Sequence, residues 1–118
     1  MTGGAGGAGQ GGGIFSDNGT LTITNVTIIG NQALGGNGSD GGQGGNGLGG
    51  GLFVNSAASV DLDASRIIDN LAQGGTGGTG GQGVGGGIYD LGTLKVGPSS
   101  TVVGNRASTA DPNFFPPR

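Results

Sequence analysis

Hydrophobic and polar residues alternate in short runs along the chain. Residues 20–24 read TLTIT and residues 59–63 read SVDLD, and both runs alternate strictly. An apolar residue at every second position is typical of a half-buried β-strand, because successive strand side chains point to opposite faces. No run shows the three- and four-residue spacing of a helix. The pattern predicts an all-β chain built from short strands.

The alternating runs belong to a repeat of three blocks. Residues 11–33, 49–72 and 85–107 each begin with GGG and end with Asn-X-Ala, and the GGG starts lie 38 and 36 residues apart. A repeat of this length with three short strands predicts one coil of a parallel β-helix per block. Each strand would pair with its equivalent in the next coil, about 4.8 Å away. We therefore expect a right-handed parallel β-helix of about three coils.

Equivalent apolar positions in the three blocks predict the core. We expect these residues to point inward as stacked columns: Ile14, Leu21, Ile23, Ile29, Leu52, Val60, Leu62, Ile68, Ile88, Leu94, Val96 and Val103. Asn31, Asn70 and Asn105 share the inward phase, so their amides should stack as a hydrogen-bonded ladder. The alternative is that each is a turn asparagine at the end of a strand.

Glycine is concentrated in the segments between the blocks. Residues 3–13, 35–51 and 74–87 hold 29 of the 34 glycines, largely as Gly-Gly-X triplets. A polyproline-II helix has three residues per turn, so this period leaves two bare ridges on which backbones can approach closely. We expect polyglycine-II-like loops that run out and back on one side of the β-helix, with a reversal near residues 38–40. Disordered loops are the alternative, because ordering glycine costs the most entropy.

The chain is expected to divide into three parts. Residues 1–10 are a glycine-rich lead-in, residues 11–107 the β-helix domain and residues 108–118 a Pro-rich tail. We expect Phe114 or Phe115 to fold back over the open end below the third coil. Prolines around them exclude a further helix or central strand. Three coils are about the minimum for a stable array, so we also expect self-association through open ends of the β-helix.

Charge and composition exclude several kinds of chemistry. Four Lys or Arg residues against seven Asp give a net charge of −3, which argues against nucleic acid as a partner. The sequence has no Cys or His, so thiol catalysis, disulfides and thiolate or imidazole metal sites are excluded. No apolar run approaches the roughly 18–20 residues of a transmembrane segment, and the first residues lack the pattern of a signal peptide. We expect no cofactor.

The blocks resemble the repeat of the polymorphic outer-membrane protein family. They carry GGGI, GGGL and GGGI, followed about twenty residues later by IIGN, IIDN and VVGN. The family's hallmarks are a GGAI-type and an FxxN-type motif, and here Ile or Val stands where Phe is usual. The blocks also resemble, more loosely, other right-handed β-helix surface proteins of bacteria. The resemblance implies an extracellular or cell-surface, non-enzymatic, adhesin-like module whose partner is a host or cell-surface glycan or protein.

Two other functional classes stay open. One is a carbohydrate-active, pectin lyase-like enzyme fragment or a carbohydrate-binding module, because Asp61, Asp63 and Asp69 lie in one coil near Arg66. A solvated rim explains the same carboxylates. The other is a fragment of a longer repeat protein.

Three further sets of residues are candidates for a site. Phe15, Phe53 and Tyr89 should form an aromatic column, either a stack that shields the coils or a platform for sugars. Residues 35–40 read GGNGSD, the first six positions of a calcium-binding nonapeptide, which makes Asp40 a calcium candidate. No second copy follows, although such sites need adjacent turns. Thr22 and Thr24 form a T-x-T pair, but the other coils do not repeat it, which argues against an ice-binding face.

Overall fold

The computed structural model describes residues 3–118, so Met1 and Thr2 of the lead-in lie outside the described residues. Its fourteen strands are β1 (Gly9–Gln10), β2 (Ile14–Thr24), β3 (Thr27–Ile29), β4 (Gln32–Leu34), β5 (Gly47–Leu48), β6 (Leu52–Asp63), β7 (Arg66–Ile68), β8 (Leu71–Gln73), β9 (Gly83–Val84), β10 (Ile88–Asp90), β11 (Thr93–Val96), β12 (Thr101–Val103), β13 (Arg106–Ala107) and β14 (Phe114–Phe115). Residues 3–118 contain no helix. The all-β prediction is confirmed.

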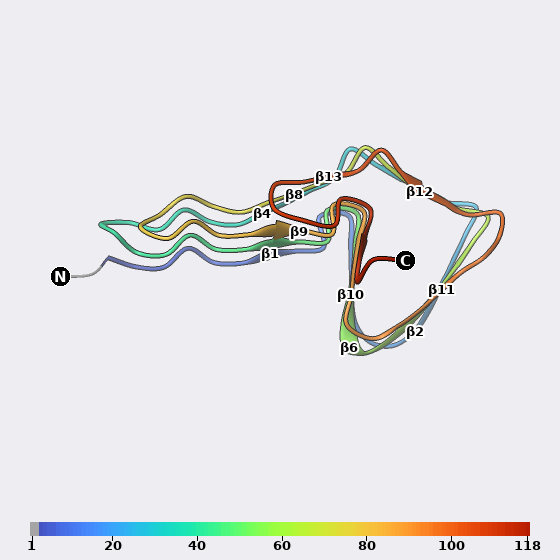
Figure 1. Ribbon diagram of the computed structural model, residues 1–118. Coiled ribbons are helices and arrows are strands. Elements are labelled where there is room, and N and C mark those ends of the chain that lie inside the picture. Colours follow the sequence, from blue (N-terminus) through green and yellow to red (C-terminus); the bar gives the residue numbers. More distant parts are fainter. Residues whose placement is uncertain (1–2) are drawn as a thin grey trace.

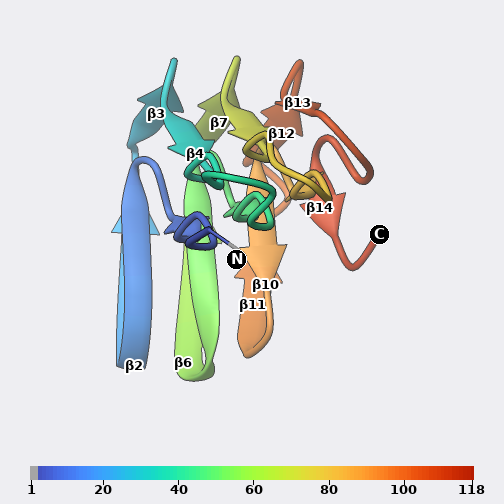
Figure 2. The ribbon, with the colours of Figure 1, turned by 90° about the vertical axis from the view of Figure 1, so that its left-hand side faces the viewer.

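The strands form four sheets, and all ten strand pairs of the described residues are parallel. Each block contributes one strand to the sheets β12-β7-β3 and β13-β8-β4, so strands pair with their equivalents one block away. Figure 1 looks along this stack, where the three blocks overlie one another as successive turns of the chain. Figure 2 shows the same turns side by side.

The long strands β2 and β6 each contain two of the three short strands expected per block: the one that follows GGG and the alternating run TLTIT or SVDLD. They pair continuously from Ile14 with Leu52 to Thr24 with Asp63, apart from a shift in register between Ser16 and Asn18. In the third block the same path is split into β10 and β11. The two expected strands are therefore one bent strand in the first two blocks.

The core columns agree with the prediction along β2, β6, β10 and β11. Leu52, Leu62 and Ile88 are fully buried. Ile14 and Leu21, at the first block, pack against the same cluster and are only partly buried. Apolar residues of one phase of these strands therefore fill the interior.

The prediction is wrong for β3, β7 and β12. Ile28, Ile67 and Val102 are buried there, and the predicted inward residues are their neighbours. Ile29 and Val103 are 52% and 51% exposed, and Ile68 is partly exposed. The cause is a corner between these strands and the next, where the following residue is left-handed: φ is 70° at Gly30, 55° at Asp69 and 67° at Gly104. This turn resets the alternation of inward and outward side chains. The inward orientation of the asparagines after the corner therefore does not predict which residues point inward before it.

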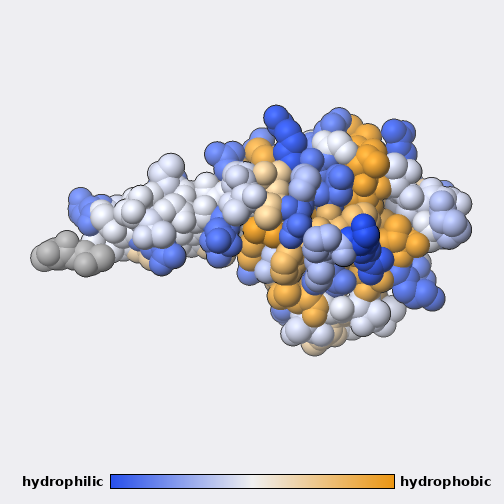
Figure 3. Space-filling view, in the orientation of Figure 1, coloured by the Kyte–Doolittle hydropathy of each residue, from blue (hydrophilic) through white to orange (hydrophobic). Residues whose placement is uncertain are grey.

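The glycine-rich segments project from one corner of the coils as a single arm (Figure 1). We call residues 3–10, 35–48 and 74–84 the glycine arm. The second tract reverses in a turn in which the Gly42 N–H donates to the Ser39 carbonyl, with positive φ at Asp40 and Gly41. In Figure 3 the arm is mostly of intermediate hydropathy, whereas apolar surface is concentrated on the coils. The reversal falls one to two residues later than residues 38–40.

The C-terminal tail folds back onto the third coil. Phe114 and Phe115 of β14 pair with Ile88 and Tyr89 of β10. The Phe114 side chain packs against the core cluster, which confirms that one of the two rings covers this end. Because β14 lies at the sheet edge, the prolines that flank it remove no internal hydrogen bond of the sheet.

Candidate functional site

Four asparagine side chains form a continuous column across the coils, which we call the asparagine ladder. The Nδ2 of Asn31, Asn70 and Asn105 donates to the Oδ1 of Asn70, Asn105 and Asn113, at 3.1, 3.0 and 3.1 Å. The backbone N–H groups of the same three donors bond to the same oxygens. Each accepting oxygen therefore receives two hydrogen bonds from the coil before it.

The ladder also binds backbone carbonyls at the corner. Asn70 Nδ2 lies 2.9 Å from the Ile28 carbonyl and 3.0 Å from that of Ile68. Asn105 bonds the equivalent carbonyls in the next coil. Asn70 is fully buried, and a buried amide left without partners would be costly. The ladder and turn interpretations of these residues therefore describe the same side chains.

The GGG segments lie directly against the ladder. A Cβ atom at Gly13, Gly51 or Gly87, the third glycine of each, would lie 3.0, 3.1 or 2.8 Å from the ladder Nδ2 of the same coil. The first glycine of each segment has a positive φ between 67° and 71°, which glycine adopts without steric cost. The GGG motif and the asparagine motif of each block therefore meet in space, although about twenty residues separate them in the sequence.

The aromatic column contains four rings rather than three. Phe15 and Phe53 stack with centroids 5.0 Å apart, and Phe53 and Tyr89 with centroids 5.2 Å apart. Phe115 of the tail adds a ring 4.5 Å from Tyr89. Phe53 is buried and Phe15 is 43% exposed, so only the first ring offers a large free surface.

A second polar column at the other corner was not found from the sequence. Ser65, which is fully buried, accepts a hydrogen bond from the Val26 N–H at 3.0 Å, and its own N–H donates to Ser100 Oγ at 3.1 Å. The only sequence signal is that both serines follow a turn in equivalent places. Because the first coil carries Val26 there instead, the alignment of the blocks hides the column.

The glycine arm is held together by backbone hydrogen bonds. The N–H of Gly81 donates to Gly75, Gly75 to Gly45, Gly45 to Gly36 and Gly36 to Gly7, at 2.7–2.8 Å. This row of backbone hydrogen bonds links all five runs of the arm, which are the lead-in and the outgoing and returning halves of the second and third tracts. Additional bonds such as Gly6 to Gln43 link neighbouring blocks. At the inner glycines a Cβ atom would overlap a neighbouring carbonyl.

Two shallow grooves run along the arm. One, of about 240 Å³, lies between the lead-in and the returning run of the second tract, beside Gln43 and Asn46. The other, of about 230 Å³, lies between two outgoing runs, beside Asn37 and Thr76. Both combine bare glycine backbone with amide or hydroxyl side chains.

The candidate carboxylates face outward from different places. Asp61 and Asp63 lie two residues apart on β6, so they share its outer face. Asp69 lies beyond the next corner. Asp61 sits in register with Thr22 and Lys95. In residues 3–118 no group of three acidic side chains is arranged to hold a metal ion.

Asp40 lies at the tip of the glycine arm and is exposed. It belongs to the reversing turn, where its φ is 48°. Among the described residues, Asp40 belongs to no group of three or more acidic side chains that could hold a metal ion.

Asp90 is a partly buried carboxyl at the end of β10. Partial burial raises the pKa of its carboxyl above the ordinary value of 3.8, against the opposing effects of the Gly92 N–H and the charge of Arg118. The Gly92 N–H donates to Asp90 at 2.9 Å, which shapes the turn between β10 and β11.

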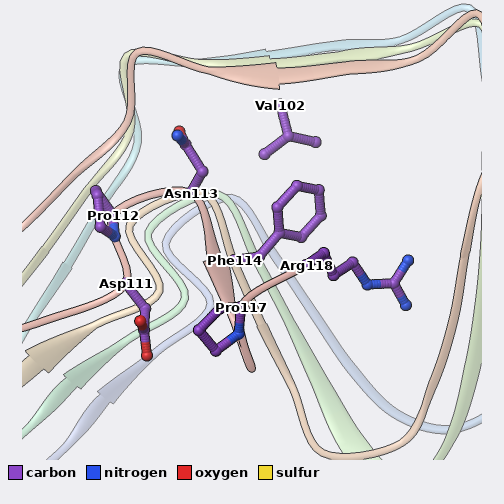
Figure 4. A pocket seen from close by; sticks show the side chains of 7 residues that line it. All are labelled: Val102, Asp111, Pro112, Asn113, Phe114, Pro117 and Arg118. Carbon is purple, nitrogen blue, oxygen red and sulfur yellow. The ribbon is translucent and has the colours of Figure 1, made fainter.

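A hollow of about 370 Å³ lies under the tail (Figure 4). Val102, Asn113 and Phe114 border it, and Arg118 extends along its side (Figure 4). The Arg118 guanidinium lies 5.7 Å from the centre of the Phe114 ring and donates to the Leu94 carbonyl at 2.8 Å. The tail therefore covers this end of the core only in part.

No protein-family model matches the chain, and neither a curated protein nor a solved structure matches it. Within residues 3–118 no helix has the length and apolar character needed to span a membrane. The expected relation to the polymorphic outer-membrane proteins stays a prediction.

Proposed function

We propose that the chain is a short right-handed parallel β-helix that serves as a non-enzymatic, adhesin-like module of a bacterial cell-surface or secreted protein. The parallel pairing of equivalent strands and the asparagine ladder support the β-helix. The resemblance of the GGG and Asn-containing motifs to the polymorphic outer-membrane protein repeat supports the cellular setting.

The two grooves of the glycine arm carry the binding part of the proposal. Side chains at Gln43, Asn46, Asn37 and Thr76 offer amide and hydroxyl groups beside them. Such groups form hydrogen bonds with sugar hydroxyls and with peptide backbone. The row of backbone hydrogen bonds through Gly45 and Gly75 fixes the runs that carry these side chains relative to one another. Little conformational entropy is therefore lost on binding. We propose that the grooves bind an extended glycan or peptide of a cell surface.

Adhesion of displayed protein tests this proposal. The full chain is displayed on a non-adherent bacterium, and the cells retained on host cells and on glycan arrays are counted. We expect retention by the intact chain and a loss of about tenfold for Gln43→Ala combined with Thr76→Val, which removes hydrogen bonds from both grooves. Asp61→Asn with Asp63→Asn is the matched control on the coils and should not change retention. Retention that is equal for all variants would contradict the proposal.

The carbohydrate-active alternative depends on the shared outer face of Asp61 and Asp63. It predicts release of reducing ends from an acidic polysaccharide and loss of that release in the Asp61→Asn variant. The same variants are displayed on cells for the adhesion assay and purified for the cleavage assay, so one set of variants separates adhesion from cleavage.

A further inference from the structure

The two ends of the coil stack are built differently. At the C-terminal end the tail repeats the start of a coil, because Phe114 and Phe115 pair with Ile88 and Tyr89. Asn113 occupies the place of the third glycine: its carbonyl accepts the Ile88 N–H at 2.9 Å, as the Gly87 carbonyl accepts that of Leu52. This asparagine therefore enters the ladder from a position where every complete coil has glycine.

Asn113 ends the ladder at this side. A complete fourth coil would place its own asparagine amide where the Asn113 side chain now accepts from Asn105. The Asn113 Cβ and amide fill that place, and the Arg118 guanidinium occupies the outward carbonyl of Leu94. A further coil cannot stack on the third one unless the tail leaves.

At the opposite end the ladder is open. The Oδ1 atoms of Asn70, Asn105 and Asn113 each accept two hydrogen bonds. Within residues 3–118 no hydrogen bond is donated to Asn31 Oδ1, the equivalent oxygen of the first coil, and this residue is partly exposed. Phe15, at the same end of the ring stack, is 43% exposed. Asn31 at the end of the asparagine ladder and Phe15 at the end of the ring stack are therefore both accessible to a partner.

The outer edge of β2 is also accessible. The Asn25 N–H donates to the Asp63 carbonyl, and strand backbone groups alternate in direction, so the N–H groups of Thr20, Thr22 and Thr24 point away from β6. No strand of residues 3–118 pairs with this edge. Proteins commonly protect an edge with Lys or Pro, yet all Lys, Arg and Pro residues of this chain lie within residues 66–118.

We propose that the first-coil end is an interaction surface for one kind of partner: an uncapped coil of the same GGG-and-Asn repeat, carried by another polypeptide. The partner's asparagine N–H and Nδ2 donate to Asn31 Oδ1, its aromatic ring stacks on Phe15 and its strand pairs with β2. The tail covers the third coil and prevents intact copies from supplying this coil to one another. The self-association expected from the sequence would therefore need a copy whose tail has left the third coil. Two first coils do not pair face to face, because both Asn31 oxygens are acceptors. This inference rests on the proposed β-helix.

The surface has the size of a specific interface. The molecule measures 51 × 27 × 20 Å along its principal axes, and Figure 1 looks onto the broad face that the end coils present. A coil laid on that face buries on the order of 1,000 Å² on each partner, which is in the range of stable protein interfaces.

Sedimentation of mixtures tests the proposal with full-length chains. The donor probe carries Asn113→Gly, Phe114→Gly and Phe115→Gly, which release the tail without shortening the chain. We expect the intact chain alone to be monomeric and the donor alone to form head-to-tail oligomers. Added intact chain should shorten these oligomers, because its first coil binds the uncovered third coil at the end of an oligomer and its own tail blocks further addition. A folded donor that stays monomeric, or an intact chain that dimerises by itself, would overturn the proposal.

A matched pair at one position tests the edge. In the intact chain, Thr22→Pro removes the outward N–H and should weaken binding to the donor at least about tenfold. Thr22→Val retains that N–H and should bind like the unmodified chain. Equal binding by the two variants would contradict the docking of a strand on β2.

A covalently extended chain tests the same proposal if the donor probe fails to fold. A copy of residues 49–84 is inserted between Gln10 and Gly11, so that the added coil precedes the first one. We expect a higher melting temperature, and a smaller gain when the inserted copy carries Asn70→Ala. An unchanged or lower melting temperature would overturn the docking proposal. An intact chain without a cooperative β-sheet melt would instead overturn the β-helix on which it rests.

Discussion

The coils and the glycine arm repeat with the same period, but side chains contribute to them in opposite ways. In the coils, side chains add contacts to the backbone pairing of the parallel strands: apolar columns around Leu62, the asparagine ladder and the ring stack. In the arm, backbone N–H and carbonyl groups form the contacts, and the absence of side chains lets the runs approach. Substitutions should therefore act oppositely in the two regions: removal of atoms harms the coils, and addition of atoms harms the arm.

The largest effect is expected where the coils concentrate hydrogen bonds. Asn70→Ala removes an acceptor of two hydrogen bonds and a donor to several buried partners. The free energy of unfolding should fall by about 3–5 kcal/mol, measured by urea denaturation. Asn31→Ala, at the open end of the same ladder, is the control and should cost about 1–2 kcal/mol. Equal small losses would mean that the ladder contributes little.

Ile67 of β7 and Ile29 of β3 test which side chains of these neighbouring strands point inward. Ile67→Ala removes a fully buried side chain and should cost about 2–5 kcal/mol. Ile29→Ala removes a half-exposed one and should change stability by about 0.5 kcal/mol or less. Thermal or urea unfolding measures both. If Ile29→Ala were the more destabilising change, Ile29 would point inward, as the sequence pattern predicts, and the structure would be contradicted at this position.

A single added methyl group tests the arm. The Cβ of Gly81→Ala would overlap the Gly45 carbonyl, so neighbouring runs must separate, at a cost of about 1–3 kcal/mol. Hydrogen exchange of arm amides should accelerate about tenfold or more, while the melt of the coils changes little. Gln43→Ala, at an exposed third position, is the control and should leave exchange unchanged. Unaltered protection in Gly81→Ala would show that the runs are not closely packed.

The smallest effect concerns the titration of Asp90. Because burial raises its pKa in the folded state, the folded protein binds this proton more tightly than the unfolded chain does. Stability from this group is present below the ordinary value of 3.8 and is lost as the pH rises through the raised pKa. Asp90→Asn should therefore gain stability relative to the unmodified protein as the pH increases toward neutral. A difference that stays constant with pH would contradict the raised pKa.

The sequence predicts the strands of the coils well because their alternation is local. The columns through Leu52, Val60 and Leu62 follow from period-two patterns in three aligned blocks. The phase fails at Ile29 because a left-handed residue at the corner resets the alternation. Nothing in the hydrophobic pattern marks that turn, since Gly30, Asp69 and Gly104 do not share one residue type.

The missed parts of the candidate site depend on contacts distant in sequence. Asn113 and Phe115 enter the ladder and the ring stack from the tail, outside the repeat that identified the other members. Ser65 and Ser100 form their column without a counterpart at Val26. The arm grooves arise only when glycine runs from different blocks lie side by side, and no single tract contains that information.

Amide hydrogen exchange of the intact chain, resolved by residue, tests most directly whether coils and arm form one ordered stack. The N–H groups of Gly36, Gly45, Gly75 and Gly81 link all runs of the arm. We predict that these four amides exchange at least about a hundredfold more slowly than an unfolded chain, alongside the Asn70 amide of the ladder. Protection of Asn70 with unprotected arm glycines would contradict the account, because the arm would then be a set of disordered loops.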